Sequence, residues 1–213
     1  MTSLSENPLS IALLALPEST PATLYGLHEV LAAVGTAWEE ATGQRSDARR
    51  MAPSIVARRR EVFASPGGLP IAPQATLAEM PRPDVIIATD LVIDDVPRGK
   101  WQDEIAWARD CYAEGAVMTS VCTGAFFLAE AGLLDGKEAT THWSVAAQFR
   151  AAYPNVRLRE ERILCPAGDG HKIITGGGVS AWQDLALYLV ARFSGEEEAR
   201  RIAKVYVLGD RSA

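Results

Sequence analysis

One cysteine in this chain lies where a side chain is well placed to do chemistry. Cys122 separates a short apolar run, residues 116–121, from a second apolar run, residues 126–134. The first run predicts a buried strand, and the second predicts a helix that starts immediately after it. A residue on such a strand-to-helix turn is held in a tight backbone geometry, with its side chain over the edge of the sheet. The sequence therefore makes Cys122 the candidate catalytic nucleophile.

The neighbours of Cys122 favour a reactive thiol or a bound ligand. The N–H groups at the start of the following helix carry partial positive charge, which favours a thiolate or an anion. Thr123 and Gly124 are small, so a ligand is able to approach the backbone closely. A free cysteine is, however, often a small buried apolar residue with no chemical role. Both interpretations remain open, and the position on the turn favours a pocket.

Three other residues are candidates for the same pocket. Asp90 follows the apolar run 84–88 and is expected at the same sheet edge, where it either lines the pocket or caps a turn. His142 stands at a predicted helix start and either reaches the pocket or bonds the backbone. Gly177, in the glycine run 176–178, predicts a tight strand-to-helix turn near the pocket.

Composition limits the class of protein. The chain has 213 residues, of which 48% are hydrophobic and 23% charged, as expected for a soluble globular protein with a full core. The formal net charge of −6 argues against independent nucleic-acid binding. A local basic cluster is expected to be a solvated strand edge or an interaction surface, and it consists of Arg45, Arg49, Arg50, Arg58, Arg59 and Arg60.

No compartment signal or metal motif is present in the sequence. No apolar run is long enough to cross a bilayer and the first ten residues are unlike a signal peptide, so a cytoplasmic protein without membrane contact is predicted. The three cysteines, Cys111, Cys122 and Cys165, are far apart, which argues against disulfides and structural zinc. No spacing of His, Asp or Glu suits a metal, and no nucleotide signature occurs. We therefore expect no metal and no cofactor.

Strands and helices alternate along the chain. Strands are predicted at 11–16, 54–59, 84–88 and 116–121, with a hairpin at 163–174. Helices are predicted at 23–34, 101–113, 126–134, 143–152, 180–193 and 196–207. This alternation predicts an α/β fold with a mostly parallel central sheet covered on both faces. Ligands of such folds bind beyond the carboxyl ends of the strands, where Cys122 is expected.

Several motifs resemble one known family. Residues 120–136, SVCTGAFFLAEAGLLDG, and residues 139–143, ATTHW, resemble the ThiJ/PfpI superfamily, which is class I glutamine amidotransferase-like. The resemblance implies a flavodoxin-like three-layer sandwich with a cysteine on the strand-to-helix elbow. Residues 24–31, LYGLHEVL, and residues 182–189, WQDLALYL, more narrowly resemble the N-terminal sensor domain of AraC-family transcriptional regulators. The similarity extends from residue 11 to residue 212.

The chain departs from the superfamily pattern at the catalytic positions. Hydrating members such as isonitrile hydratase pair the elbow cysteine with an acid, and the matching position here is Thr23, whose hydroxyl is not a general base. Glu18 is an alternative acid but is expected at the surface. Hydrolytic members place a histidine directly after the cysteine, where this chain has Thr123. Asp90 and Leu91 stand where many members carry a Gly-Gly pair, so the chain departs from the family also at the backbone donors of an oxyanion site.

The resemblance implies a sensor rather than an enzyme. We expect a single domain at residues 10–213 behind a flexible tail at 1–9, which binds a small-molecule ligand and forms a homodimer. DNA would be bound only by a C-terminal helix-turn-helix domain absent from this chain, so we expect an isolated sensor domain of a longer regulator. The pocket residues implied are Thr23, Asp90, Thr123, Gly124, His142 and Gly177. The alternatives are a cysteine-dependent enzyme resembling isonitrile hydratase, with Cys122 as nucleophile, and a redox-sensing protein.

Overall fold

A seven-stranded sheet organises the fold in the computed structural model, which describes residues 7–209. All pairs of neighbouring strands are parallel except β10 with β11. In spatial order the strands are β10 (Leu164–Ala167), β11 (Ile173–Gly176), β7 (Val117–Val121), β6 (Val85–Ala88), β1 (Leu9–Leu14), β2 (Met51–Ala57) and β5 (Ala75–Thr76). Two small two-stranded sheets consist of β3 (Phe63–Ala64) with β4 (Pro70–Ile71), and β8 (Glu138–Ala139) with β9 (Arg157–Leu158).

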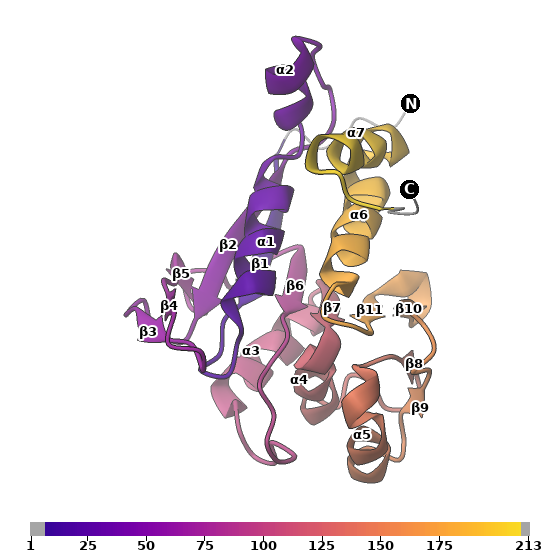
Figure 1. The fold of residues 1–213 in the computed structure, drawn as a ribbon. Coiled ribbons are helices and arrows are strands. Elements are labelled where there is room, and N and C mark those ends of the chain that lie inside the picture. Colours follow the sequence, from indigo (N-terminus) through magenta and orange to yellow (C-terminus); the bar gives the residue numbers. More distant parts are fainter. Residues whose placement is uncertain (1–6, 210–213) are drawn as a thin grey trace.

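Helices cover both faces of the sheet because its strands are apolar on both sides. Leu14 and Ile86 pack into a cluster with α3, α4 and α5, whereas their neighbours Leu13 and Ile87 pack into one with α1, α6 and α7 (Figure 1). The helices are α1 (Pro21–Ala32), α2 (Ala37–Thr42), α3 (Gln102–Ala113), α4 (Ala125–Glu130), α5 (Ala146–Ala152), α6 (Ala181–Ser194) and α7 (Glu196–Tyr206). Short 3₁₀ turns occupy Cys122–Gly124, Trp143–Val145 and Asp169–His171.

The helix α7 is tied to the segment around α2, and the two lie side by side at the top of Figure 1. Glu198 on α7 is buried, with only 2% of its surface exposed. It accepts a hydrogen bond from the backbone N–H of Gly35 (2.7 Å) and another from the hydroxyl of Ser46 (2.7 Å). A buried acid therefore joins the last helix to the loops on either side of α2.

The predicted fold class is confirmed: the molecule is an α/β sandwich with a mostly parallel central sheet. The first strand starts at Leu9, inside the range predicted as a tail, because its side chain is buried beside β2. Residues 1–6 of that predicted tail, residues 210–212 of the C-terminal similarity, and residue 213 lie outside the described residues. The short helix α2 and the strand pair β8–β9 were not predicted, since six-residue and two-residue elements carry too little periodicity.

Membrane insertion through a helix has no basis in residues 7–209. None of the helices described there combines the length and the apolar character that a span requires.

Candidate functional site

Cys122 occupies the sharp turn between β7 and α4, as predicted. Its φ of 56° lies in the left-handed region, which is unusual for a residue other than glycine and marks a strained position. The turn is held from two sides. Gly124 packs so closely on β6 that an added Cβ would lie 2.5 Å from the carbonyl oxygen of Thr89, and closer still to that of Ala88. On the other side, the hydroxyl of Thr141 donates a hydrogen bond to the carbonyl oxygen of Cys122 (3.0 Å).

The thiol of Cys122 is not activated, which corrects the expectation of a thiolate at a helix start. The residue is 4% exposed, and burial raises the pKa of the thiol from 9.0 to about 11. Hydrogen bonding from Thr123 lowers this pKa in part, while the negative charge of Asp90 raises it. Desolvation therefore outweighs the helix terminus, and the group is a neutral thiol at neutral pH.

The raised pKa predicts slow alkylation of Cys122 in the folded protein. A pKa of about 11 in place of 9.0 leaves about a hundredfold less thiolate near neutral pH than a free cysteine has. Because the folded pKa is raised, the rate in the native chain should climb until about pH 11, whereas in urea it should level off near pH 9. Iodoacetamide labelling read by mass spectrometry at this peptide measures both rates. Equal rates near neutral pH for native and unfolded chains would contradict the assignment.

Asp90 lies at the predicted sheet edge and is buried, with 5% of its surface exposed. One carboxylate oxygen accepts a short hydrogen bond from the hydroxyl of Thr20, and the other oxygen has no partner among the described residues. Thr23, in the first turn of α1, is fully buried, and its hydroxyl likewise has no partner among the described residues. Unsatisfied buried polar atoms are rare and call for an explanation, and a bound polar group would provide one.

The hydroxyl of Thr123 is already engaged with the backbone of Leu91. It accepts a hydrogen bond from the Leu91 N–H (2.7 Å) and donates one to the Leu91 carbonyl (2.6 Å). Thr123 therefore fixes the loop after β6 against the elbow, which reduces its capacity to bind a ligand.

His142 and Gly177 have structural contacts of their own. The ring Nδ1 of His142 lies 2.7 Å from the hydroxyl of Ser144 and accepts a hydrogen bond from the Ser144 N–H (3.3 Å), so it caps its own 3₁₀ turn. Gly177 donates its N–H to the carbonyl of Ile163 (2.8 Å), and an added Cβ would lie 2.7 Å from the carbonyl oxygen of Arg162. Close backbone packing thus explains this glycine without a ligand.

Two loops are joined over the place where the strand order reverses, between β1 and β6. Ser19 and Leu91 form an isolated antiparallel bridge. The N–H of Val92 donates to the carbonyl of Glu18 (2.9 Å), and the N–H of Thr20 donates to that of Asp90 (3.2 Å). This reversal is where ligands of open α/β sheets bind, and Glu18 in the first of these loops lines a cavity.

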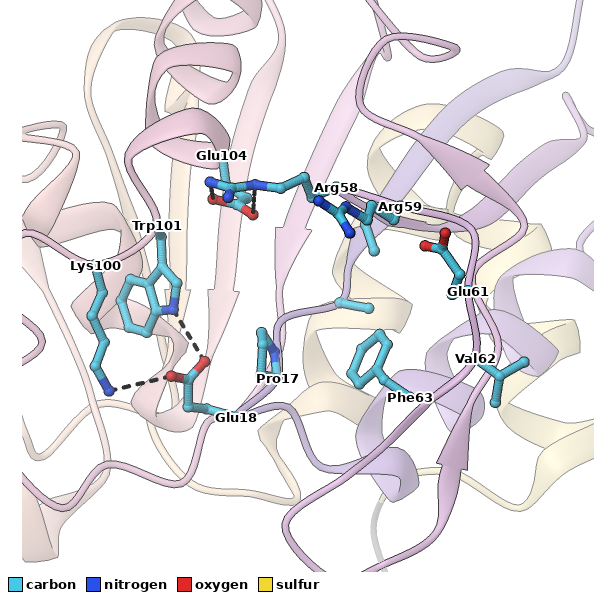
Figure 2. Close-up of a pocket in the computed structure, with 12 residues that line it drawn as sticks. Pro17, Glu18, Arg58, Arg59, Glu61, Val62, Phe63, Lys100, Trp101 and Glu104 are labelled. Atoms are coloured by element: carbon cyan, nitrogen blue, oxygen red, sulfur yellow. Dashed lines mark hydrogen bonds and ion pairs between the residues drawn. The ribbon is translucent and has the colours of Figure 1, made fainter.

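A cavity opens beside these loops, at the carboxyl ends of β1 and β2 (Figure 2). Its volume is about 420 Å³. Neither Cys122 nor any of the other predicted pocket residues lines it. The lining comes from three separate segments and consists of Ala15, Pro17, Glu18, Ala57, Arg58, Arg59, Glu61, Val62, Phe63, Lys100, Trp101 and Glu104.

Sequence reasoning missed most of this cavity. Glu18 was expected at the surface, but its carboxylate accepts hydrogen bonds from the indole N–H of Trp101 (3.1 Å) and from the Lys100 ammonium (3.3 Å). The one usable signal was position, because Pro17 directly follows the strand predicted at 11–16, and Arg58 lies near the end of the strand predicted at 54–59. Within residues 7–209, no group of three or more His, Cys, Asp or Glu side chains is arranged to hold a metal ion.

The elbow lies within the segment of the chain that matches a known protein family. The DJ-1/PfpI family model matches residues 99–192. The HTH-type transcriptional regulator CdhR of Pseudomonas aeruginosa is 35% identical over 105 residues, which cover 49% of this chain and 30% of that protein. The regulator GbdR of the same species is 30% identical, covering 70% of this chain and 38% of that protein. An isonitrile hydratase of Pseudomonas putida is 33% identical, covering 63% and 56%.

Solved structures confirm the fold. A ThiJ/PfpI family protein from Pseudomonas syringae superposes with a TM-score of 0.73 at 24% identity, covering 100% of this chain and 81% of that chain. An AraC family transcriptional regulator from Pseudomonas putida gives a TM-score of 0.70 at 16% identity, covering 92% and 97%.

Proposed function

Because the chain belongs to the DJ-1/PfpI family, we propose that it is the ligand-sensing domain of an AraC-type transcriptional regulator. The observation that carries this proposal is the similarity, at 30% to 35% identity, to HTH-type transcriptional regulators. The chain spans between 30% and 38% of the length of those regulators. The similarity therefore covers only part of each regulator.

The site supports sensing over catalysis. The neutral thiol of Cys122 is a poor nucleophile, and Thr23 offers no acid or base to activate it. The cavity at the carboxyl ends of β1 and β2 instead suits reversible binding of a small molecule. Thr123, Gly124, His142 and Gly177 then act by shaping the loops around the elbow.

The proposal includes the partners that the sequence predicted. The domain forms a homodimer, and DNA is bound through a separate helix-turn-helix domain, which requires a cytoplasmic location. Ligand binding must favour one arrangement of these domains, because equal affinity for both arrangements would leave DNA affinity unchanged.

The direct test is the gene sequence downstream of the Ala213 codon. An in-frame extension of about 100 residues with two helix-turn-helix units is expected, since such units supply the recognition helices for the major groove. A stop codon at that point would contradict the assignment of this chain to a DNA-binding regulator.

A cysteine-dependent enzyme is the second candidate, favoured by the strained backbone of Cys122 and by the similarity to an isonitrile hydratase. We expect no turnover of an aromatic isonitrile by the purified chain, because its thiol lacks an activating partner. The measurement is the loss of the isonitrile or the formation of the N-substituted formamide, with Cys122→Ser as control. Turnover that disappears in Cys122→Ser would establish the enzyme and overturn a purely sensory role.

A further inference from the structure

The cavity at the carboxyl ends of β1 and β2 has one side that is fixed in place. Glu18 accepts hydrogen bonds from Trp101 and Lys100, and Trp101 has a left-handed backbone with a φ of 59°. The ring of Trp101 packs on Phe127 of α4 with their centroids 5.9 Å apart. A strained residue persists only where its surroundings hold it firmly, so this wall of the cavity is pre-formed.

Ion pairs hold the wall of the cavity that lies at the top of Figure 2. Arg58 pairs with Asp103 (2.7 Å) and with the buried Glu104 (3.3 Å). The charges of Arg58, Lys100, Glu18 and Glu104 are thus satisfied within the protein and are not free to bind a charged ligand.

Two opposite charges remain without a partner at the same cavity. Arg59 and Glu61 line it, and neither forms an ion pair or hydrogen bond with any of the residues 7–209. Figure 2 places both side chains on the same side of the cavity, above Phe63. The lining carries three cationic and three carboxylate side chains in total, so it offers no net charge to a ligand that is only an anion or only a cation. The lining favours a ligand that carries one positive and one negative charge.

The remaining walls are apolar and partly aromatic. The rings of Trp101 and Phe63 lie on opposite sides of Pro17 in Figure 2. Ala15 and Ala57 also line the cavity. A volume of about 420 Å³ lies within the usual range for small-molecule sites, which bury an apolar body and fix it with a few polar groups.

We infer that this cavity binds a zwitterionic α-amino acid with an apolar side chain. The guanidinium of Arg59 binds the carboxylate, Glu61 accepts hydrogen bonds from the primary ammonium, and the side chain lies between Trp101 and Phe63. The inference rests on the proposed function, since it identifies the molecule to be sensed, and it assigns the ligand to a site that excludes Cys122.

The test is calorimetric titration of the chain with L-leucine, L-methionine, L-phenylalanine and L-tryptophan. At least one should bind with a dissociation constant below about 1 mM. For L-phenylalanine, the analogues 3-phenylpropionate and phenethylamine, which each keep one charge, should bind about tenfold more weakly or worse. These analogues test the charge requirement on the unaltered protein, independently of the stability of any variant.

Substitutions then locate the site. Arg59→Gln and Glu61→Gln should each weaken binding by about tenfold or more. The matched control is Arg60→Gln on the same turn, because Arg60 pairs with Glu79 and does not line the cavity; it should leave the affinity unchanged. Cys122→Ser should also leave it unchanged.

Three results would overturn the inference: no binding by any of the four amino acids, analogues that bind as well as L-phenylalanine, or affinities unaffected by Arg59→Gln and Glu61→Gln. Each outcome is independent of the downstream gene sequence. The ligand assignment can therefore fail while the regulator proposal stands, and the reverse also holds.

Discussion

Replacing Gly124 with alanine is expected to lower the free energy of unfolding by about 3 kcal/mol. The added Cβ would overlap the carbonyl oxygens of Ala88 and Thr89, which belong to the end of β6 and the residue after it. These are backbone atoms in the buried sheet, so they cannot move aside as a flexible side chain would. Urea unfolding followed by circular dichroism measures the change.

The matched control for Gly124→Ala is Gly178→Ala. Gly178 lies on the neighbouring loop, and an added Cβ there has no heavy atom within 4 Å. Its substitution should change stability by no more than about 0.5 kcal/mol. Similar losses at both positions would show that the close approach of the elbow to β6 is not what requires Gly124.

The second large effect is expected at the buried acid of α7. Glu198→Ala should cost about 2–3 kcal/mol, because it leaves the Gly35 N–H and the Ser46 hydroxyl without their acceptor. The adjacent Glu197→Ala removes a side chain that is 73% exposed and whose only ion-pair partner within residues 7–209 is Arg201. That control should change stability by no more than about 0.5 kcal/mol. Urea midpoints that shift equally in the two variants would refute the structural role assigned to Glu198.

The architecture was predictable because its signals are local. Residues 85–88 form a continuous apolar run, which is the pattern of a parallel strand buried on both faces. The first helix was predicted to end at residue 34; it ends at Ala32, and Gly35 follows within three residues with a φ of 80°. The elbow at Cys122 was found in the same way, since two apolar runs met there with no loop between them.

The properties of the site were less predictable because they depend on distant segments. The pKa of Cys122 is set by burial under parts of the chain that the sequence does not place next to it. The local signal, a helix start, predicted a lowered pKa for this thiol, whereas burial raises it. The cavity is formed by three segments, around Glu18, Phe63 and Trp101, and the bond between Glu18 and Trp101 joins residues 83 positions apart. No periodic pattern in the sequence predicts a contact between residues so far apart.

The two edges of the large sheet also restrict how copies of this protein can associate. At one edge, β5 is only two residues long, and at the other, β10 contains Pro166, which has no N–H to donate. Short strands and prolines are features that prevent edge-to-edge pairing of sheets. A homodimer of this domain would therefore not extend the sheet from one subunit into the next. It would have to form through helices and loops, where side chains rather than backbone hydrogen bonds determine which partner is accepted.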